Sequence, residues 1–170
     1  AVSLLALVAC TPEKKQEADY SQYVNPMIGT DFTGNTYPGA QVPFGMVQLS
    51  PDNGLPGWDR ISGYFYPDTT IAGFSHTHLS GTGAGDLYDI SFMPVTRPYK
   101  EAPAPLGIYS TFSHNDEAAS AGYYRVLLKD YNINVELTAT ERCGIQRYTF
   151  PEAEASVFLN LKKAMNWDFT

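Results

Sequence analysis

The residues best suited to chemistry lie between Gly63 and Asp86, in the stretch GYFYPDTTIAGFSHTHLSGTGAGD. This stretch combines two histidines, His76 and His78, with glycines and several hydroxyl-bearing side chains. Imidazoles and hydroxyls hydrogen-bond to polar ligands, and glycines let the main chain approach a ligand closely. The stretch therefore predicts a pocket for a polyhydroxylated molecule rather than part of a packed core.

The two histidines are two residues apart, so on a strand both rings would point to the same side. This spacing permits a shared zinc ion, for which His114, Asp86 or Asp89 would have to supply a third ligand. None of those three residues has a characteristic spacing. We favour imidazoles that hydrogen-bond a ligand or a ligand-facing loop, and the alternative is two histidines that only satisfy backbone groups.

The run from Gly81 to Asp86, GTGAGD, is rich in glycine and ends in a carboxylate. It resembles a dinucleotide-binding motif only superficially, because that motif precedes a helix and a strand-like segment follows here. We expect a tight loop in which Gly81, Gly83 and Asp86 contact a ligand, partly through main-chain N–H groups. The alternative is an ordinary connection between strands.

A third candidate is the trio Trp58, Asp59 and Arg60. An exposed indole can pack on the apolar face of a sugar ring while the neighbouring charges bind its hydroxyls. The alternative is a tryptophan that caps the edge of a core. Hydrolysis of a sugar linkage needs two carboxyl groups at a defined separation, but no pair stands out, and no Ser-His-Asp set is recognisable. We expect most of the aspartates to be turn or surface residues: Asp31, Asp52, Asp59, Asp68, Asp86 and Asp89.

Length and composition limit the class of protein. The chain has 170 residues, of which 44% are hydrophobic and 17% are charged, so it can form a folded domain with a core. Its 12 tyrosines and 9 phenylalanines are typical of strands and of sugar-facing surfaces. A net charge of −7 argues against binding to nucleic acid, because little would neutralise the phosphates.

The first ten residues, AVSLLALVAC, are typical of a targeting segment with a clipped front. Their apolar run is too short to span a bilayer and ends at Cys10, like the bacterial lipobox in which the cysteine is lipidated. Residues 11–20 would then form a tether, and the protein would be periplasmic or anchored at the outer membrane. The alternative is a signal peptide that happens to end in cysteine. Cys143, the other cysteine, lies in a strand-like stretch and is expected to be a buried thiol.

Residues 21–170 predict one all-β domain, an antiparallel β-sandwich. Apolar residues alternate with polar ones from Ile133 to Thr140, which is the period of a half-buried strand, and residues 130–132 fit a hairpin loop before it. The chain stops at Thr170 just as a strand gives way to a turn, so we expect a longer protein. The expected strands are residues 46–50, 88–95, 122–129, 133–140, 142–150 and 156–161.

Three ordered motifs resemble the N-terminal domain of glycoside hydrolase family 92: VNPMIGT at 24–30, YPGAQVPFGMVQLSPDN at 37–53, and the stretch at 63–86. The resemblance covers residues 20–170. It implies a bacterial exo-acting α-mannosidase in which a β-sandwich packs on an (α/α)6 barrel, with the active site at their interface. It also implies inversion and calcium dependence, with the catalytic acid, the base and most calcium ligands in the barrel.

The resemblance carries the substrate-binding role onto His76, His78, the Gly81–Asp86 loop, Trp58 and Asp59, and it places no catalytic residue and no metal ligand in this chain. The expected partners are a mannose-containing glycan and the barrel of the same protein. We expect the 170 residues alone to be inactive and poorly soluble, because one face would be an apolar surface made for the barrel. The alternatives are a stand-alone carbohydrate-binding sandwich and a surface lipoprotein with a structural role.

Overall fold

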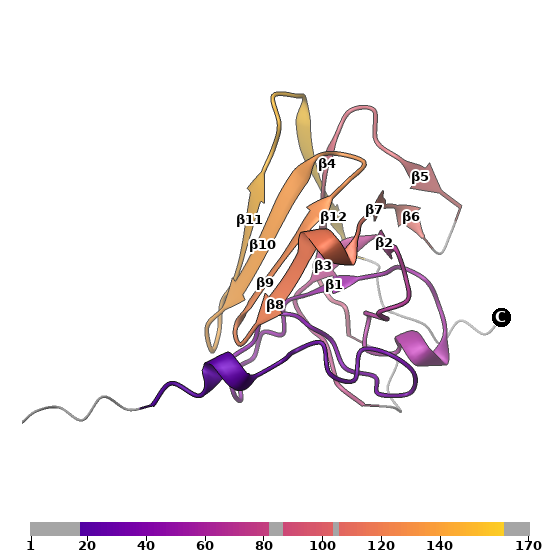
Figure 1. Ribbon diagram of the computed structural model, residues 1–170. Helices are drawn as coiled ribbons and strands as arrows, with labels where there is room; N and C mark the ends of the chain where they lie inside the picture. The colour runs from indigo at the N-terminus through magenta and orange to yellow at the C-terminus, as the bar shows by residue number, and fades with distance from the viewer. Residues whose placement is uncertain (1–17, 82–86, 104–105, 162–170) are drawn as a thin grey trace, which may run out of the picture.

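The structure, a computed structural model, describes residues 18–81, 87–103 and 106–161. All regular elements in these ranges are strands or single turns of 3-10 helix, and the strands are antiparallel (Figure 1). The chain is therefore all-β, which confirms the expected antiparallel β-sandwich. No helix in the described ranges is long and apolar enough to cross a membrane.

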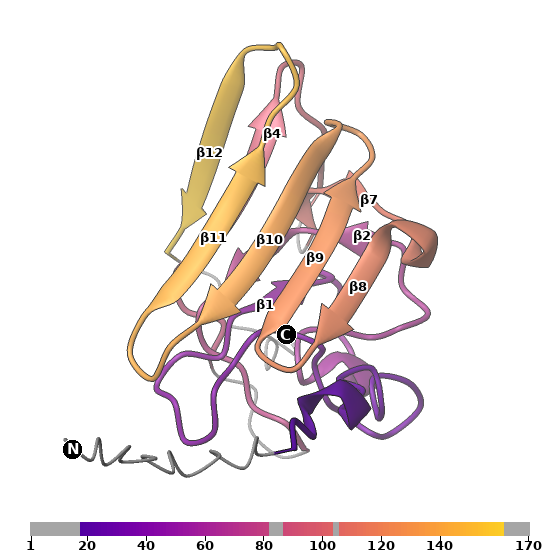
Figure 2. The same ribbon diagram turned by 60° about the vertical axis from the view of Figure 1, so that its left-hand side comes forward.

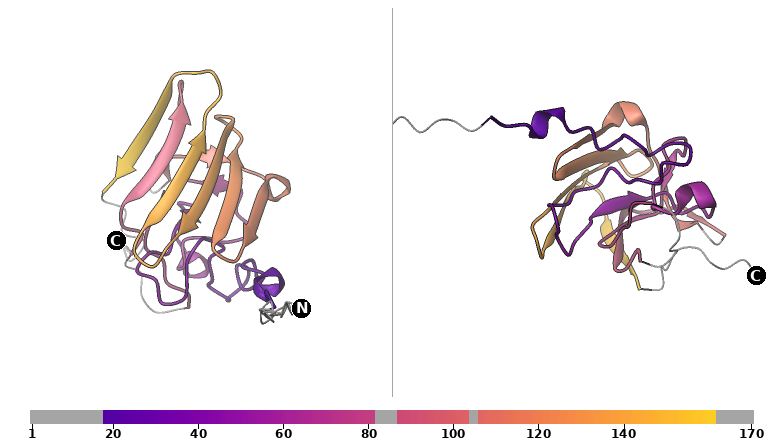
Figure 3. Two further views of the ribbon diagram at one scale, coloured as in Figure 1. Left: turned by 90° about the vertical axis from the view of Figure 1, so that its left-hand side faces the viewer. Right: turned by 90° about the horizontal axis from the view of Figure 1, so that it is seen from below.

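Two four-stranded sheets form the body of the domain. The first has the strand order β1 (Ser50–Asp52), β3 (Gly73–Ser75), β4 (Ser91–Thr96) and β12 (Ala155–Asn160). The second has the order β11 (Gly144–Thr149), β10 (Ile133–Ala139), β9 (Tyr123–Leu128) and β8 (Glu117–Ser120). Figures 2 and 3 show β4 and β12 beside the β11 edge of the second sheet.

The core lies between the sheets because each strand turns its apolar face inward. In β10 the side chains of Ile133, Val135 and Leu137 are buried while the residues between them face outward, as the alternation predicted. They meet buried residues of the first sheet and its loops, among them Phe74 and Tyr64. Each fully buried aliphatic or aromatic side chain contributes roughly 1.5–3 kcal/mol, so this layer holds the sheets together.

Short elements join the sheets and lie in the loops. They are η1 (Ser21–Tyr23), η2 (Trp58–Arg60), η3 (His114–Asp116), the pair β2 (Thr70–Ile71) and β7 (Ser110–Thr111), and the pair β5 (Glu101–Ala102) and β6 (Gly107–Ile108). Residues 24–49 form a long irregular segment, with one isolated bridge between Ala40 and Leu49. This segment and η2 lie at the lower end of the sheets in Figure 1, where the candidate site is found.

The strands differ from the sequence-based expectation in the first sheet. A strand was expected at 46–50, but β1 begins only at Ser50. The strand expected from Tyr88 begins instead at Ser91, because Leu87, Tyr88 and Ile90 have positive φ angles of 99°, 64° and 54° that interrupt extended backbone. The other four strands agree within two residues at each end, and the hairpin turn before β10 is confirmed.

Cys143 corrects a second expectation. We expected a buried thiol, but this residue is exposed. The pairing of β10 with β11 ends at Ala139 and Gly144, so Cys143 lies in the turn that joins them rather than in a strand. Its N–H donates to Thr140 Oγ1 at 3.1 Å, and its carbonyl accepts from the Thr140 N–H at 2.8 Å. In this turn the Cys143 side chain points away from the core.

Candidate functional site

A cavity of about 450 Å³ opens where the loop at 37–48 meets the loop at 77–81. Its lining combines polar groups with apolar ones, which is the composition of a small-molecule site. Phe44 and Leu79 are exposed at this surface. The polar side chains of the lining include those of Tyr37, Gln41, Gln48 and Ser80.

Two of these polar groups are already oriented by hydrogen bonds. The Tyr37 hydroxyl donates to Gln41 Oε1 at 2.6 Å, and Gln48 Nε2 donates to the carbonyl of Gly45 at 2.7 Å. Burial raises the pKa of Tyr37 to about 12, so its hydroxyl stays protonated at neutral pH. The cavity therefore offers fixed, uncharged hydrogen-bonding groups, which suit a ligand that carries hydroxyls.

His78 lies beneath this cavity with its side chain fully buried. Its Nε2 is 2.8 Å from Asp52 Oδ1, and its Nδ1 is 2.7 Å from the carbonyl oxygen of Gln48. Both ring nitrogens thus face acceptors inside the protein. The small exposed part of the residue is main chain, since 3% of the whole residue but none of its side chain is exposed.

Ser75 completes a cluster with Asp52 and His78 that sequence reasoning did not find. Its hydroxyl donates to Asp52 Oδ1 at 3.1 Å and lies 3.2 Å from His78 Nε2. In a hydrolytic triad the carboxylate and the serine face different ring nitrogens. Here both face Nε2 and Ser75 is fully buried, so the cluster holds segments together and does not present a nucleophile.

Asp52 and Asp68 were expected to be turn or surface residues, and the structure shows that both are buried. Asp52 pairs with His78, which lies 26 residues later in the sequence, and Asp68 pairs with Arg60, which lies 8 residues earlier. A buried carboxylate needs such a partner to offset its lost hydration. The only local signal at Asp52 was PDNG, which reads as a turn, so the residue could not be recognised from its neighbours.

His76 is separated from His78 because β3 ends at Ser75 and no strand holds the two rings on one side. His76 Nδ1 donates to the carbonyl of Ile90 at 3.0 Å, and the ring packs edge-on against Phe92. It lines a groove of about 280 Å³ between β4 and β11. His76 therefore lies away from the cavity above His78.

The zinc alternative receives no support from the described ranges, which contain no group of three His, Cys, Asp or Glu side chains that could hold a metal ion. His114 belongs to a different cluster, where it contacts Glu117 and the carbonyl of Tyr66. Asp89 accepts a hydrogen bond from the hydroxyl of Thr77. Asp86, the remaining ligand considered, lies outside the described residues.

Trp58 and Asp59 lie in η2, and Trp58 is 51% exposed. Arg60 does not join them as a sugar-binding group, because its guanidinium donates to both oxygens of Asp68, at 2.6 and 2.5 Å, and lies over the ring of Phe65. The hydrogen bond to Asp68 raises the pKa of Arg60 further. Of the three residues, only Trp58 and Asp59 remain available to a ligand, because Arg60 is bound to Asp68.

Gly81 is exposed and has a φ of +102°, a conformation that favours glycine. Its N–H donates to the carbonyl of Asn35 at 2.7 Å and so joins the loop to the irregular segment. The expectation that loop N–H groups face a ligand therefore does not extend to this one. Gly83, Asp86 and Cys10 lie outside the described residues, and their predicted roles remain predictions.

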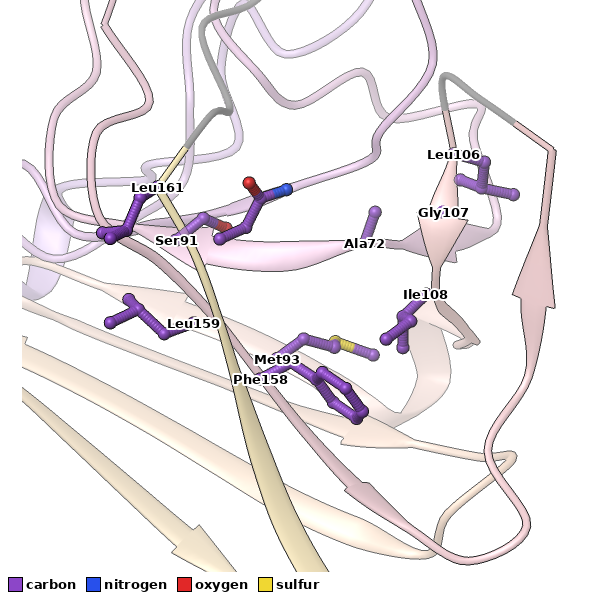
Figure 4. Close-up of a pocket in the computed structure, with 10 residues that line it drawn as sticks. Ala72, Ser91, Met93, Leu106, Gly107, Ile108, Phe158, Leu159 and Leu161 are labelled. Carbon is purple, nitrogen blue, oxygen red and sulfur yellow. The ribbon is translucent and has the colours of Figure 1, made fainter.

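A second groove, of about 420 Å³, lies between β4, β12 and β6. Figure 4 shows Met93, Ile108 and Phe158 gathered on one side of it, with Leu159 of β12 and Leu161, just after β12, further along the chain. Most of its lining is aliphatic or aromatic, and none of the lining residues is titratable. Its surface does not suit a polyhydroxylated ligand, so we retain the cavity above His78 as the candidate site.

Comparison with known proteins now decides the family. Residues 23–170 match the profile of the glycosyl hydrolase family 92 N-terminal domain. The chain belongs to this family. A solved relative, the family 92 α-mannosidase BT3965 from Bacteroides thetaiotaomicron in complex with mannoimidazole, is 46% identical with a TM-score of 0.77. The match covers 83% of this chain and 19% of that one.

Two more distant relatives agree with this assignment to family 92. The inverting mannosidase BT2199, also from Bacteroides thetaiotaomicron, is 31% identical with a TM-score of 0.68, over 85% of this chain and 20% of its own. An uncharacterized secreted glycosidase from Arthroderma benhamiae is 27% identical over 89% of this chain and 20% of its own. The family 92 chain described here thus spans about a fifth of the length of these relatives.

Proposed function

We propose that this chain is the N-terminal domain of an exo-acting α-mannosidase and helps to form its active site. The observation that carries the proposal is the 46% identity, over 83% of the chain, to an α-mannosidase whose structure holds mannoimidazole. The cavity above His78, with its fixed and uncharged polar groups, fits a sugar. The substrate is then a terminal mannose of an α-linked glycan.

Trp58 and Asp59 are the residues of η2 that we assign to sugar contact. The half-exposed indole offers an apolar face, and the carboxylate beside it can accept hydrogen bonds from hydroxyls. We assign the catalytic acid and base to the barrel. Inversion requires these two carboxyl groups to lie about 6.5–9.5 Å apart with a water molecule between them.

Calcium dependence is part of the proposal, and the described residues contain no group of three His, Cys, Asp or Glu side chains that could hold the ion. Calcium prefers six to eight oxygen ligands. We therefore assign its ligands to the barrel and derive no step of the reaction through it.

The barrel is also the partner that we propose for the exposed apolar side chains of β11 and β12. Ile145, Val157 and Leu159 are each about half exposed. Ile145 lies on an edge strand of the second sheet, and Val157 and Leu159 lie on an edge strand of the first sheet. Exposed apolar groups of this kind are typical of a surface that meets another domain. Anchoring through a lipidated Cys10, at the outer membrane or in the periplasm, completes the proposal, and the secreted relative is in keeping with export.

The full-length protein tests this function. We expect it to cleave at least one α-mannobiose, to release β-mannose first as followed by NMR, and to lose activity when EDTA removes calcium. The 170-residue chain alone should show no turnover. Failure of the full-length protein to cleave any α-linked mannobiose or 4-nitrophenyl α-mannoside, with calcium present, would contradict the proposal.

Replacing Trp58 with alanine in the full-length protein should raise KM about tenfold, because losing one aromatic stacking surface costs about 1–1.5 kcal/mol. The change in kcat should be smaller, since the indole binds the sugar rather than the reacting atoms. Steady-state kinetics on the best α-mannoside measure this effect. The control is Tyr20→Ala, which removes another exposed aromatic ring ahead of η1 and should leave KM unchanged. Equal KM values for the Trp58 variant and wild type would exclude the indole from the site.

A further inference from the structure

We propose that Asp52 is a positioning residue that holds η2 and the loop at 77–81 in one arrangement. The inference rests on the proposed function, because these two segments carry or border the groups that we assign to the sugar. Asp52 is fully buried and reaches neither the cavity nor any bulk solvent. Its carboxylate acts on the site through other residues.

Hydrogen-bond donors from two other strands and from His78 surround the Asp52 carboxylate. Asp52 lies on β1 and accepts from Ser75 of β3 at 3.1 Å and from His78 at 2.8 Å, both at Oδ1. Its Oδ2 lies 3.5 Å from the hydroxyl of Ser91, at the start of β4. One buried charge thus joins three neighbouring strands to an imidazole, and a buried charge keeps such donors in place because losing them is costly.

His78 connects this cluster to the loop that borders the cavity. The imidazole is fixed at both nitrogens, by Asp52 and by the Gln48 carbonyl, and it packs between the rings of Tyr37 and Tyr88 at centroid distances of 5.1 and 5.2 Å. A ring held in this way cannot rotate or shift without breaking several contacts. Its main chain continues directly into Leu79 and Ser80, which line the cavity. The orientation of His78 therefore sets the position of that lining.

The same cluster also contacts the backbone that follows η2. Gly63 lies so close that an added Cβ would be 2.9 Å from Asp52 Oδ1 and 3.0 Å from His78 Cδ2. The Gly63 N–H donates to the carbonyl of Arg60, the last residue of η2, at 2.9 Å. The Tyr88 hydroxyl donates to the carbonyl of Ile61. The backbone that follows Trp58 and Asp59 thus rests on the Asp52–His78 pair.

The test uses the full-length protein with Asp52→Asn, which keeps the shape of the side chain and removes its charge. The matched control is Glu117→Gln, which makes the same change at another buried carboxylate. Glu117 is bonded to Tyr64, Tyr124 and His114, none of which lines the cavity. Two readouts are taken for each variant: KM and kcat on the best α-mannoside, and amide hydrogen exchange.

For Asp52→Asn we expect KM to rise about 10–100-fold with a smaller change in kcat, because small displacements of binding groups weaken substrate positioning. Amides in residues 57–63 and 77–81 should exchange faster, while those of β9 and β10 keep the wild-type rate. Glu117→Gln should change neither KM nor exchange in those two segments.

Two results would overturn the inference: unchanged KM and exchange in Asp52→Asn, or faster exchange spread equally over β9 and β10, which indicates general destabilisation. If the wild-type protein cleaves no α-mannoside, the proposed function fails by that result alone. Hydrogen exchange then still decides whether Asp52 couples the two segments.

Discussion

A Gly63→Ala variant should lose about 3–5 kcal/mol of its free energy of unfolding. Gly63 has a φ of +90°, a conformation that strains any residue with a Cβ. An added Cβ would also lie 2.6 Å from Cε1 of Tyr88, whose ring is packed against His78 and cannot move aside. Backbone strain and steric overlap therefore act together. Urea denaturation of the variant and the wild type measures the loss.

Gly122→Ala is the matched control for this prediction. Gly122 also has a positive φ, +74°, but an added Cβ would meet only the carbonyl oxygen of Gln41 at 3.8 Å, an ordinary contact. The Gly122→Ala variant should lose only the part of the free energy of unfolding that comes from backbone strain, roughly 1–2 kcal/mol. Equal losses in the two variants would show that crowding around Asp52, His78 and Tyr88 has no energetic weight.

The second large effect is expected for Glu117→Ala, which should lower the free energy of unfolding by about 3–5 kcal/mol. The Glu117 side chain is 1% exposed and accepts from the hydroxyls of Tyr64 and Tyr124, at 2.9 and 2.5 Å, and from His114 Nδ1 at 2.7 Å. Burial raises the pKa of both tyrosines, so they remain protonated donors at neutral pH. Alanine would leave two buried hydroxyls and the part-buried His114 without their acceptor.

Glu136→Ala is the control here, because Glu136 also accepts from a side-chain nitrogen and a tyrosine hydroxyl, those of Arg147 and Tyr123, but at the solvent-exposed face of the sheet. Exposed pairs of this kind are compensated by water when they break, so its effect should be small. The same urea titrations compare the two variants. A Glu117→Ala protein that is as stable as Glu136→Ala would show that the buried network does not support the fold.

Three strands of the second sheet, β9, β10 and β11, could be predicted because the pattern that specifies them is local, whereas β8 was missed. From Ile133 to Ala139 every other side chain is buried, and the period of two is visible in the sequence itself. In the first sheet, β12 was predicted within one residue at each end, but β1 and β4 were not. Its strand β4 begins late because Tyr88 and Ile90 adopt left-handed backbone, and side-chain identity alone gives no sign of that.

The candidate site was predictable only in part, for the same reason. His78 was recognised as an important residue, but its buried partner Asp52 is 26 residues away and appeared to be part of a turn. Without that partner, His78 was predicted to hydrogen-bond a ligand or a ligand-facing loop. The structure shows a ring bonded inside the protein, with one of its bonds to Gln48, which lines the cavity. Arg60 was likewise paired in prediction with Trp58, although Asp68 binds it through two hydrogen bonds.

The hydrogen bonds to Asp52 also affect the order in which the chain folds. Its donors, Ser75, His78 and Ser91, are 23, 26 and 39 residues away, so long segments must close before any of these bonds forms. Closing such segments costs chain entropy, whereas the hairpin of β9 and β10 needs only a short turn. We expect the hairpin to form early and the cavity above His78 to form among the last parts of the domain.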